Sequence, residues 1–198
     1  MMKYDFDEII ERRGTDSIKW SKKLLKENFG EEECIPMWIA DMDFLAAKPI
    51  REAIMERAHH GIFGYGHKSK EFLEAAVNWQ KKRNGWDIEP EWILFTPGII
   101  PALSFIVETF CNRGDKVLIQ SPVYYPFANI IKDNGCHVVN NPLILKNGIY
   151  EMNFSELEEL AQDSRVKLMI LCSPHNPVGR VWTEEELKRL GEICLKNN

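Results

Sequence analysis

Segments with strand character and segments with helical character alternate along the chain from residue 92 onwards. The strand-like segments are short and apolar, and they lie at 92–95, 116–120, 136–139 and 167–172. A helical pattern follows each of them, at 101–111, at 125–134, from Ser155 and from Thr183. This alternation is typical of an α/β fold with a mostly parallel sheet, because helices make the crossover connections. The last strand-like segment is apolar on both faces, which indicates helices on both faces of the sheet.

Local signals predict where several helices begin. Ahead of the alternating region we expect a short helix at 5–12 and longer ones at 49–60 and 69–83. A Ser or Thr followed three residues later by Glu forms a capping box, which predicts helix starts at Ser155 and Thr183. A further strand is expected after the last helix, where the chain stops. We therefore expect an incomplete sheet and interpret the sequence as a fragment.

The composition argues against several classes of protein. With 44% hydrophobic and 11% aromatic residues, the 198-residue chain is not typical of disorder. A net charge of −5 without a basic run argues against nucleic-acid binding. The five cysteines are far apart and form no Cys-x-x-Cys pair, so we expect reduced, buried thiols in a cytoplasmic protein and no metal site. The polar N-terminus predicts no signal peptide, and no apolar run is long enough for a membrane span.

Three loops after predicted strands carry unusual residues, at the end of the sheet where α/β proteins bind ligands. In the loop 96–101, Gly98 permits a tight turn, and the backbone N–H groups that follow it could bind a phosphate at a helix N-terminus. An ordinary strand-to-helix turn would use the same glycine, and taken alone this explanation is favoured.

The second and third loops offer an aromatic ring and an amide. Tyr124 lies between two prolines after the strand 116–120, where it could present a flat face to an aromatic ligand or simply pack. Asn176 follows the strand 167–172 and could donate a hydrogen bond to a phenolate or carbonyl oxygen, although Asn-Pro also starts turns. We interpret His175 as a loop histidine without a partner, not as a general base.

The order of these residues resembles one protein family. Asn176-Pro-Val-Gly179 is similar to the Asn-Pro-x-Gly signature of the pyridoxal-phosphate (PLP) dependent class I/II aminotransferases of fold type I, and the Gly98 loop and Tyr124 precede it in the expected order. The segment Trp38-Ile-Ala-Asp-Met-Asp-Phe44 resembles the corresponding segment of the cystathionine β-lyase branch of carbon–sulfur lyases. The resemblance covers essentially all of the chain and implies the N-terminal half of a three-layer PLP-transferase fold.

The resemblance also implies roles for individual residues. The backbone amides of Ile99 and Ile100 would hold the PLP phosphate after Gly98, Tyr124 would stack on the pyridine ring, and Asn176 would bond the phenolic oxygen. Trp38 and Ala40 would lie near the substrate, and the Ala40 backbone would meet its carboxylate. Tyr65 would reach the phosphate of a partner subunit, which implies a homodimer.

Domain boundaries and missing residues follow from the same resemblance. Residues 1–47 would form an N-terminal arm and part of a small domain, and residues 48–198 the first part of the large PLP-binding domain. The Schiff-base lysine and the acid that pairs with the pyridinium nitrogen would lie beyond residue 198, so we expect no catalytic residue here and no activity of the fragment alone. We expect Asp41 and Asp43 to serve in turns or caps and not in catalysis or metal binding.

The expected activity is that of a PLP-dependent carbon–sulfur β-lyase on cystathionine, cysteine or related S-conjugates, which yields pyruvate, ammonia and a thiol. A PLP-dependent aminotransferase is the nearest alternative. A non-catalytic sensing or interaction domain, and a truncated product without a stable fold, are further alternatives.

Overall fold

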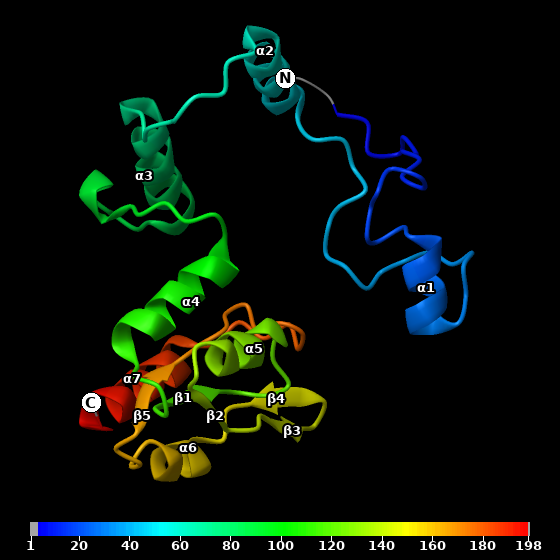
Figure 1. The fold of residues 1–198 in the computed structure, drawn as a ribbon. Helices are drawn as coiled ribbons and strands as arrows, with labels where there is room; N and C mark the ends of the chain where they lie inside the picture. The colour runs from blue at the N-terminus through cyan, green and yellow to red at the C-terminus, as the bar shows by residue number, and fades with distance from the viewer. Residues whose placement is uncertain (1–3, 198) are drawn as a thin grey trace. The chain divides into compact units, whose positions relative to one another are not determined.

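The larger sheet of this protein is parallel, as its sequence pattern predicts. The computed structural model describes residues 4–197 and divides into two compact units between Ser69 and Lys70 (Figure 1). In the second unit, the three-stranded sheet consists of β1 (Lys116–Ile119), β2 (His137–Asn140) and β5 (Val166–Met169). The strand order is β2-β1-β5, and β1 pairs in parallel with both neighbours.

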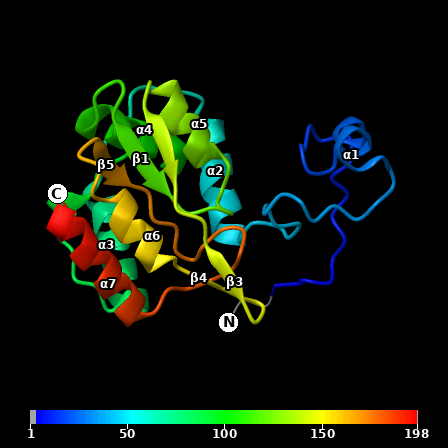
Figure 2. The ribbon, with the colours of Figure 1, turned by 90° about the horizontal axis from the view of Figure 1, so that it is seen from below.

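Helices cover both faces of this sheet. The helices of the second unit are α3 (Lys70–Asn84), the short 3₁₀ helix η1 (Pro90–Trp92), α4 (Ile99–Phe110), α5 (Pro126–Asp133), α6 (Phe154–Leu160) and α7 (Glu184–Asn197). Figure 2 shows the sheet between α4 and α5 on one side and α6 and α7 on the other. The three-layer α/β class expected from the sequence is therefore confirmed.

The central strand supplies the core on both sides. Successive side chains of a strand point to opposite faces, and Val117 and Ile119 belong to one buried cluster with residues of α4 and α5. Leu118 lies between them in sequence and belongs to the other cluster, with residues of α6 and α7. All three β1 side chains are at most 5% exposed, so the strand is apolar because both of its faces are covered.

A hairpin follows β2, and the sequence analysis missed it. Strands β3 (Ile144–Lys146) and β4 (Ile149–Glu151) pair antiparallel across Asn147 and Gly148. Both turn residues have positive φ, 53° and 79°, as a tight type I′ turn requires. Asn-Gly is a strong short-range hairpin signal, so this element was detectable.

The first unit contains α1 (Lys22–Phe29) and α2 (Lys48–His60). The second of these confirms the helix predicted at 49–60, and α3 confirms the one predicted at 69–83. The helix predicted at 5–12 is wrong, since the described residues from Tyr4 onwards form no helix there. Acidic side chains bind the nearby backbone instead: Asp5 accepts from the N–H of Asp7, and Glu11 accepts from that of Arg13. Such local bonds compete with helix formation.

Two further predictions need correction. The strand predicted at 92–95 is not formed among the described residues, because Trp92 ends the short helix η1 and residues 93–95 belong to neither sheet. Helix α6 begins earlier than Ser155, since Asn153 is its N-cap and accepts from the N–H of Glu156 at 3.4 Å. The capping box at Thr183 is confirmed, with reciprocal bonds to Glu186 of 2.8 and 3.2 Å.

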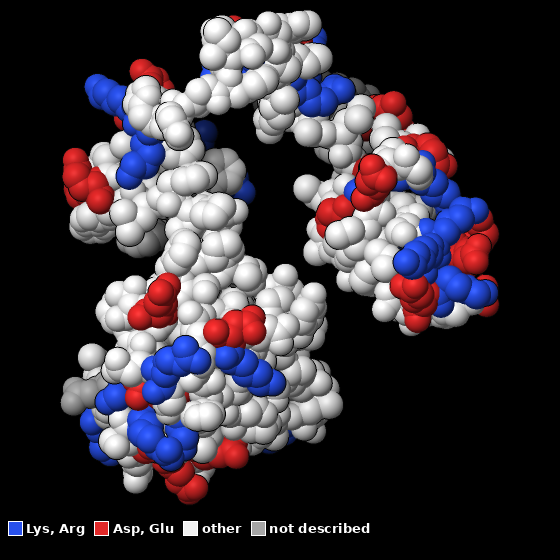
Figure 3. Space-filling view, in the orientation of Figure 1, with Lys and Arg blue, Asp and Glu red and all other residues white. Residues whose placement is uncertain are grey.

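The cysteines and the surface complete the description of the fold. All five cysteines are free thiols, but only Cys136 is buried and Cys194 is exposed, so the expectation that each is buried is wrong. On the face shown in Figure 3, basic and acidic side chains are interspersed. Among residues 4–197, no helix is both long enough and apolar enough to cross a lipid bilayer.

Candidate cofactor site

The loop before α4 presents two backbone amides. Gly98 has φ 152° and ψ 170°, a conformation that is essentially restricted to glycine. Its carbonyl accepts from the Thr96 hydroxyl at 3.0 Å and from the Ala102 N–H at 3.1 Å, which fixes the turn. The N–H groups of Ile99 and Ile100 open the helix and have no acceptor within it. They suit an anion such as a phosphate.

The loop after β1 holds an aromatic ring at its edge. The Tyr124 ring lies perpendicular to the buried Phe127, with ring centroids 5.8 Å apart. Tyr124 is 37% exposed, so part of the ring stays accessible while this contact restrains its direction. A ring held in this way can stack on a planar ligand.

The loop after β5 is a closed turn with Asn176 exposed within it. The N–H of His175 donates to the Arg180 carbonyl, and the N–H of Gly179 donates to the His175 carbonyl, both at 2.7 Å. Gly179 has φ 76°, where glycine is favoured. The Asn176 N–H donates to the Cys172 sulfur at 3.4 Å, and its side chain is left at the surface.

His175 connects the second and third loops, a role that the sequence analysis missed. Its Nε2 lies 3.1 Å from the carbonyl oxygen of Pro122, and the residue is 1% exposed. The ring also packs edge-on against Trp182, whose Nε1 donates to the Cys172 carbonyl at 2.8 Å. His175 is therefore a loop histidine as predicted, but the expectation that it has no partner is wrong. No spacing rule reveals this contact, because its partners are 53 positions apart.

All three loops are anchored on the same part of the core. Ile100, Val123 and Cys172, one from each loop or its border, pack against the buried cluster between the sheet and α4 and α5. The second and third loops also follow neighbouring parallel strands, so they leave the sheet at the same edge. The structure thus brings the second and third loops to one edge of the sheet, and the Gly98 loop borders the same buried cluster.

The predicted substrate segment lies in the first unit. Trp38 is 39% exposed, its Nε1 donates to the Lys19 carbonyl at 3.3 Å, and its ring lies edge-on to Phe29. Ala40 is exposed, and so is Tyr65.

Asp41 and Asp43 form ion pairs, not the turn or capping contacts that we expected. Both carboxylates contact the Arg12 guanidinium, and Asp43 also lies 2.6 Å from the Lys19 ammonium. The hydrogen bond from Lys19 holds the pKa of Asp43 well below its usual range, helped by bonds from Trp20 and Arg12. No group of three or more metal-ligating side chains is found among residues 4–197.

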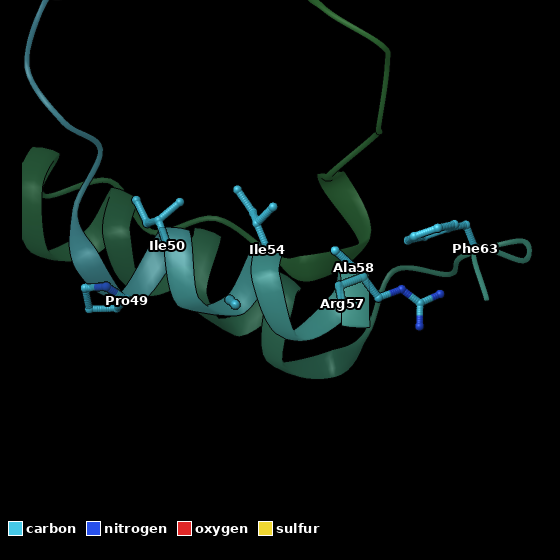
Figure 4. Close-up of a pocket in the computed structure, with 7 residues that line it drawn as sticks. Pro49, Ile50, Ile54, Arg57, Ala58 and Phe63 are labelled. Carbon is cyan, nitrogen blue, oxygen red and sulfur yellow. The ribbon is translucent and has the colours of Figure 1, made fainter. Parts of the chain in front are cut away.

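A hollow of about 640 Å³ lies along α2, and its lining differs from that of a catalytic site. Figure 4 shows Ile50 and Ile54 side by side on this helix, with Arg57 towards Phe63 at its far end. The Arg57 guanidinium lies 5.8 Å from the centroid of the Phe63 ring. The lining contains no acid–base pair, and none of the residues predicted to bind cofactor or substrate contributes to it.

Comparison with known proteins places the chain in a family. The family model described as aminotransferase class I and II matches residues 32–198. The chain belongs to the class I and II aminotransferase family. Within this family it is 47% identical to cystathionine beta-lyase PatB of Bacillus subtilis over 193 residues, which are 98% of this chain and 49% of PatB.

Two solved structures are similar to nearly the whole chain. Cystalysin from Treponema denticola, whose structure contains PLP, has a TM-score of 0.90 and 37% identity, with 98% of this chain and 50% of that chain covered. The PLP-bound C-S lyase from Staphylococcus hominis has a TM-score of 0.86 and 40% identity, with coverage of 98% and 49%. The chain therefore spans about half the length of the relatives that it matches.

Proposed function

We propose that this chain is the N-terminal half of a PLP-dependent carbon–sulfur β-lyase. Its substrates would be cystathionine, cysteine or related S-conjugates, and its products pyruvate, ammonia and a thiol. The observation that carries the proposal is the 47% identity to a cystathionine β-lyase over almost the whole chain. The five free thiols agree with a cytoplasmic location, where cysteines stay reduced.

The three loops fit the chemical groups of PLP. The amides of Ile99 and Ile100 suit the phosphate, the restrained Tyr124 ring suits the pyridine face, and the exposed Asn176 amide suits the phenolic oxygen. Bound PLP supplies an electron sink for the α-carbon of an amino acid, which permits loss of a thiolate from the β-carbon.

The chain's own residues would hold and orient the two ligands. The Gly98 turn aims the two helix amides outwards, and His175 keeps the Tyr124 and Asn176 loops at a fixed separation. The Ala40 amide would receive the substrate carboxylate, and Trp38 would lie beside the substrate. We further propose a homodimer in which Tyr65 reaches the partner's phosphate site, which agrees with its full exposure here.

The test is the release of pyruvate by the full product of the reading frame that contains residues 1–198. With PLP and L-cystathionine but no keto acid, we expect pyruvate to accumulate. Residues 1–198 alone serve as a control and should release none, because the family's Schiff-base lysine lies outside them. Turnover only after addition of a keto acid would indicate an aminotransferase, and no turnover in either case would favour a non-catalytic domain.

A further inference from the structure

Lys19 is a buried cation in the first unit, next to the predicted substrate segment. It is 7% exposed. Its ammonium nitrogen donates to the Asp43 carboxylate at 2.6 Å and to the Asp41 backbone carbonyl at 2.8 Å. Burial of a charged lysine is costly unless it is paired, and here both a carboxylate and a carbonyl satisfy it.

The same residue also holds the other side of this segment. The Lys19 carbonyl accepts from the Trp38 indole N–H at 3.3 Å. Lys19 thus contacts Trp38, two residues before Ala40, and Asp41, the residue after it. In the part of the chain that the structure describes, the Ala40 N–H has no acceptor, and Ala40 is exposed.

A second cation completes the charge balance. Arg12 contacts Asp41 with one guanidinium nitrogen and Asp43 with another, at 2.6 Å for the latter. Two cations therefore face two carboxylates. Without them, the negative charges of Asp41 and Asp43 would repel any anion that approached Ala40.

We infer that Lys19, together with Arg12, positions the Trp38–Asp43 segment and neutralises its two aspartates, Asp41 and Asp43, so that a substrate carboxylate can bind at Ala40. This inference rests on the proposed function, because only that function places a carboxylate there. Lys19 is a positioning residue, since it acts through Trp38 and the aspartates and does not itself contact the substrate.

The experiment compares Lys19→Met with Lys22→Met in the full product of the reading frame. Lys22 makes an ion pair with Glu33 and is half exposed, so it offers the same change away from the segment. Calorimetry measures the Kd of glycine, which has no β-carbon to eliminate from, and of glycinamide, which has no carboxylate. Lys19→Met should weaken glycine binding on the order of tenfold and glycinamide binding less than about twofold.

Further variants keep the inference testable if Lys19→Met does not fold. Arg12→Met removes the second cation at a more exposed position and should show the same selective loss. Lys19→Arg keeps the charge and should stay within about threefold of the wild type for glycine. In the Lys19→Met and Arg12→Met variants, the KM for L-cystathionine should rise while kcat changes little.

If Lys19→Met and Arg12→Met weaken the binding of glycine and of glycinamide equally, Lys19 and Arg12 have only a structural role and the inference is overturned. Unchanged affinities in both variants would overturn it as well. A wild-type protein that binds neither PLP nor glycine and releases no pyruvate would instead contradict the proposed function, so the two failures are distinguishable.

Discussion

His175 and Pro122 join two loops that leave the sheet from neighbouring strands. The imidazole Nε2 lies 3.1 Å from the Pro122 carbonyl oxygen, and the histidine is buried. Pro122 lies two residues before Tyr124, and His175 directly precedes Asn176. This one contact therefore sets the separation of the two side chains that we propose for the cofactor ring and its phenolic oxygen.

Replacement of His175 by leucine should destabilise the protein and weaken cofactor binding. The buried Pro122 contact is lost, which costs about 1–3 kcal/mol of unfolding free energy when a buried polar group loses its partner. The same change at His137, an exposed residue on β2, should stay within about 0.5 kcal/mol. Denaturant unfolding and PLP titration measure both effects. If the two variants behave alike, the contact has no special role.

Replacement of Gly98 by alanine should also be destabilising. At φ 152° and ψ 170° a side chain introduces backbone strain of about 1–3 kcal/mol, although the nearest atom to an added Cβ, Pro101 Cδ, is 3.7 Å away. Gly191 lies in α7 with open space around it, so alanine there should stabilise by about 0.4–1 kcal/mol. Thermal unfolding shows whether each variant raises or lowers Tm, and a Tm shift in the same direction for both variants would contradict this account.

Helix α6 offers a direct test of where a cap lies. Asn153→Ala removes the side chain that accepts from Glu156 N–H and should cost about 0.5–2 kcal/mol of unfolding free energy. Ser155→Ala changes a residue inside the helix and should lie within about 0.5 kcal/mol of the wild type. A larger loss of unfolding free energy in Ser155→Ala than in Asn153→Ala would favour the capping box at Ser155 that the sequence alone suggested.

Acid should weaken the link between β1 and the segment before β5. The hydrogen bond from Lys116 holds the pKa of Asp163 well below its usual range, with further help from the Arg165 N–H. The folded pKa is thus below the unfolded value of about 3.9, so this contribution is complete above that pH and is lost as the pH falls through the folded pKa.

Asp163→Asn should therefore lower Tm at pH 7, and this deficit should shrink as the pH falls below about 3.9. Lys116→Met removes the partner and should show the same pH dependence. Thermal unfolding across this range measures it. A deficit in Asp163→Asn that stays constant down to pH 2 would show that the ion pair does not cause the acid sensitivity.

The sequence predicted well what depends on near neighbours along the chain. Strand β1 is recognisable in the sequence because Val117 and Leu118 face opposite, covered sides of the sheet, which makes the strand apolar throughout. The capping box of Thr183 and Glu186 is visible because both bonds span three residues. The turn at Asn147 and Gly148 carried an equally local signal.

Contacts across the fold could not be predicted in this way. His175 finds its partner 53 positions away, and only the parallel pairing of β1 and β5 brings the two together. The pairing of Lys19 with Asp43 likewise joins residues 24 positions apart, with helix α1 between them in sequence. For the site, the sequence supplied the candidate residues Tyr124 and Asn176 but not what holds them in place.

We propose that the three loops around Gly98, Tyr124 and Asn176 together bind PLP. Equilibrium titration of the full reading-frame product with PLP tests this proposal most directly, with Tyr124→Leu, Asn176→Ala and Asn28→Ala, a control in helix α1 outside the three loops, compared with the wild type. We expect one PLP per chain, a loss of affinity on the order of tenfold in the first two variants, and no change in the third. Equal PLP affinity in all four proteins, or no PLP binding by the wild type, would contradict the account.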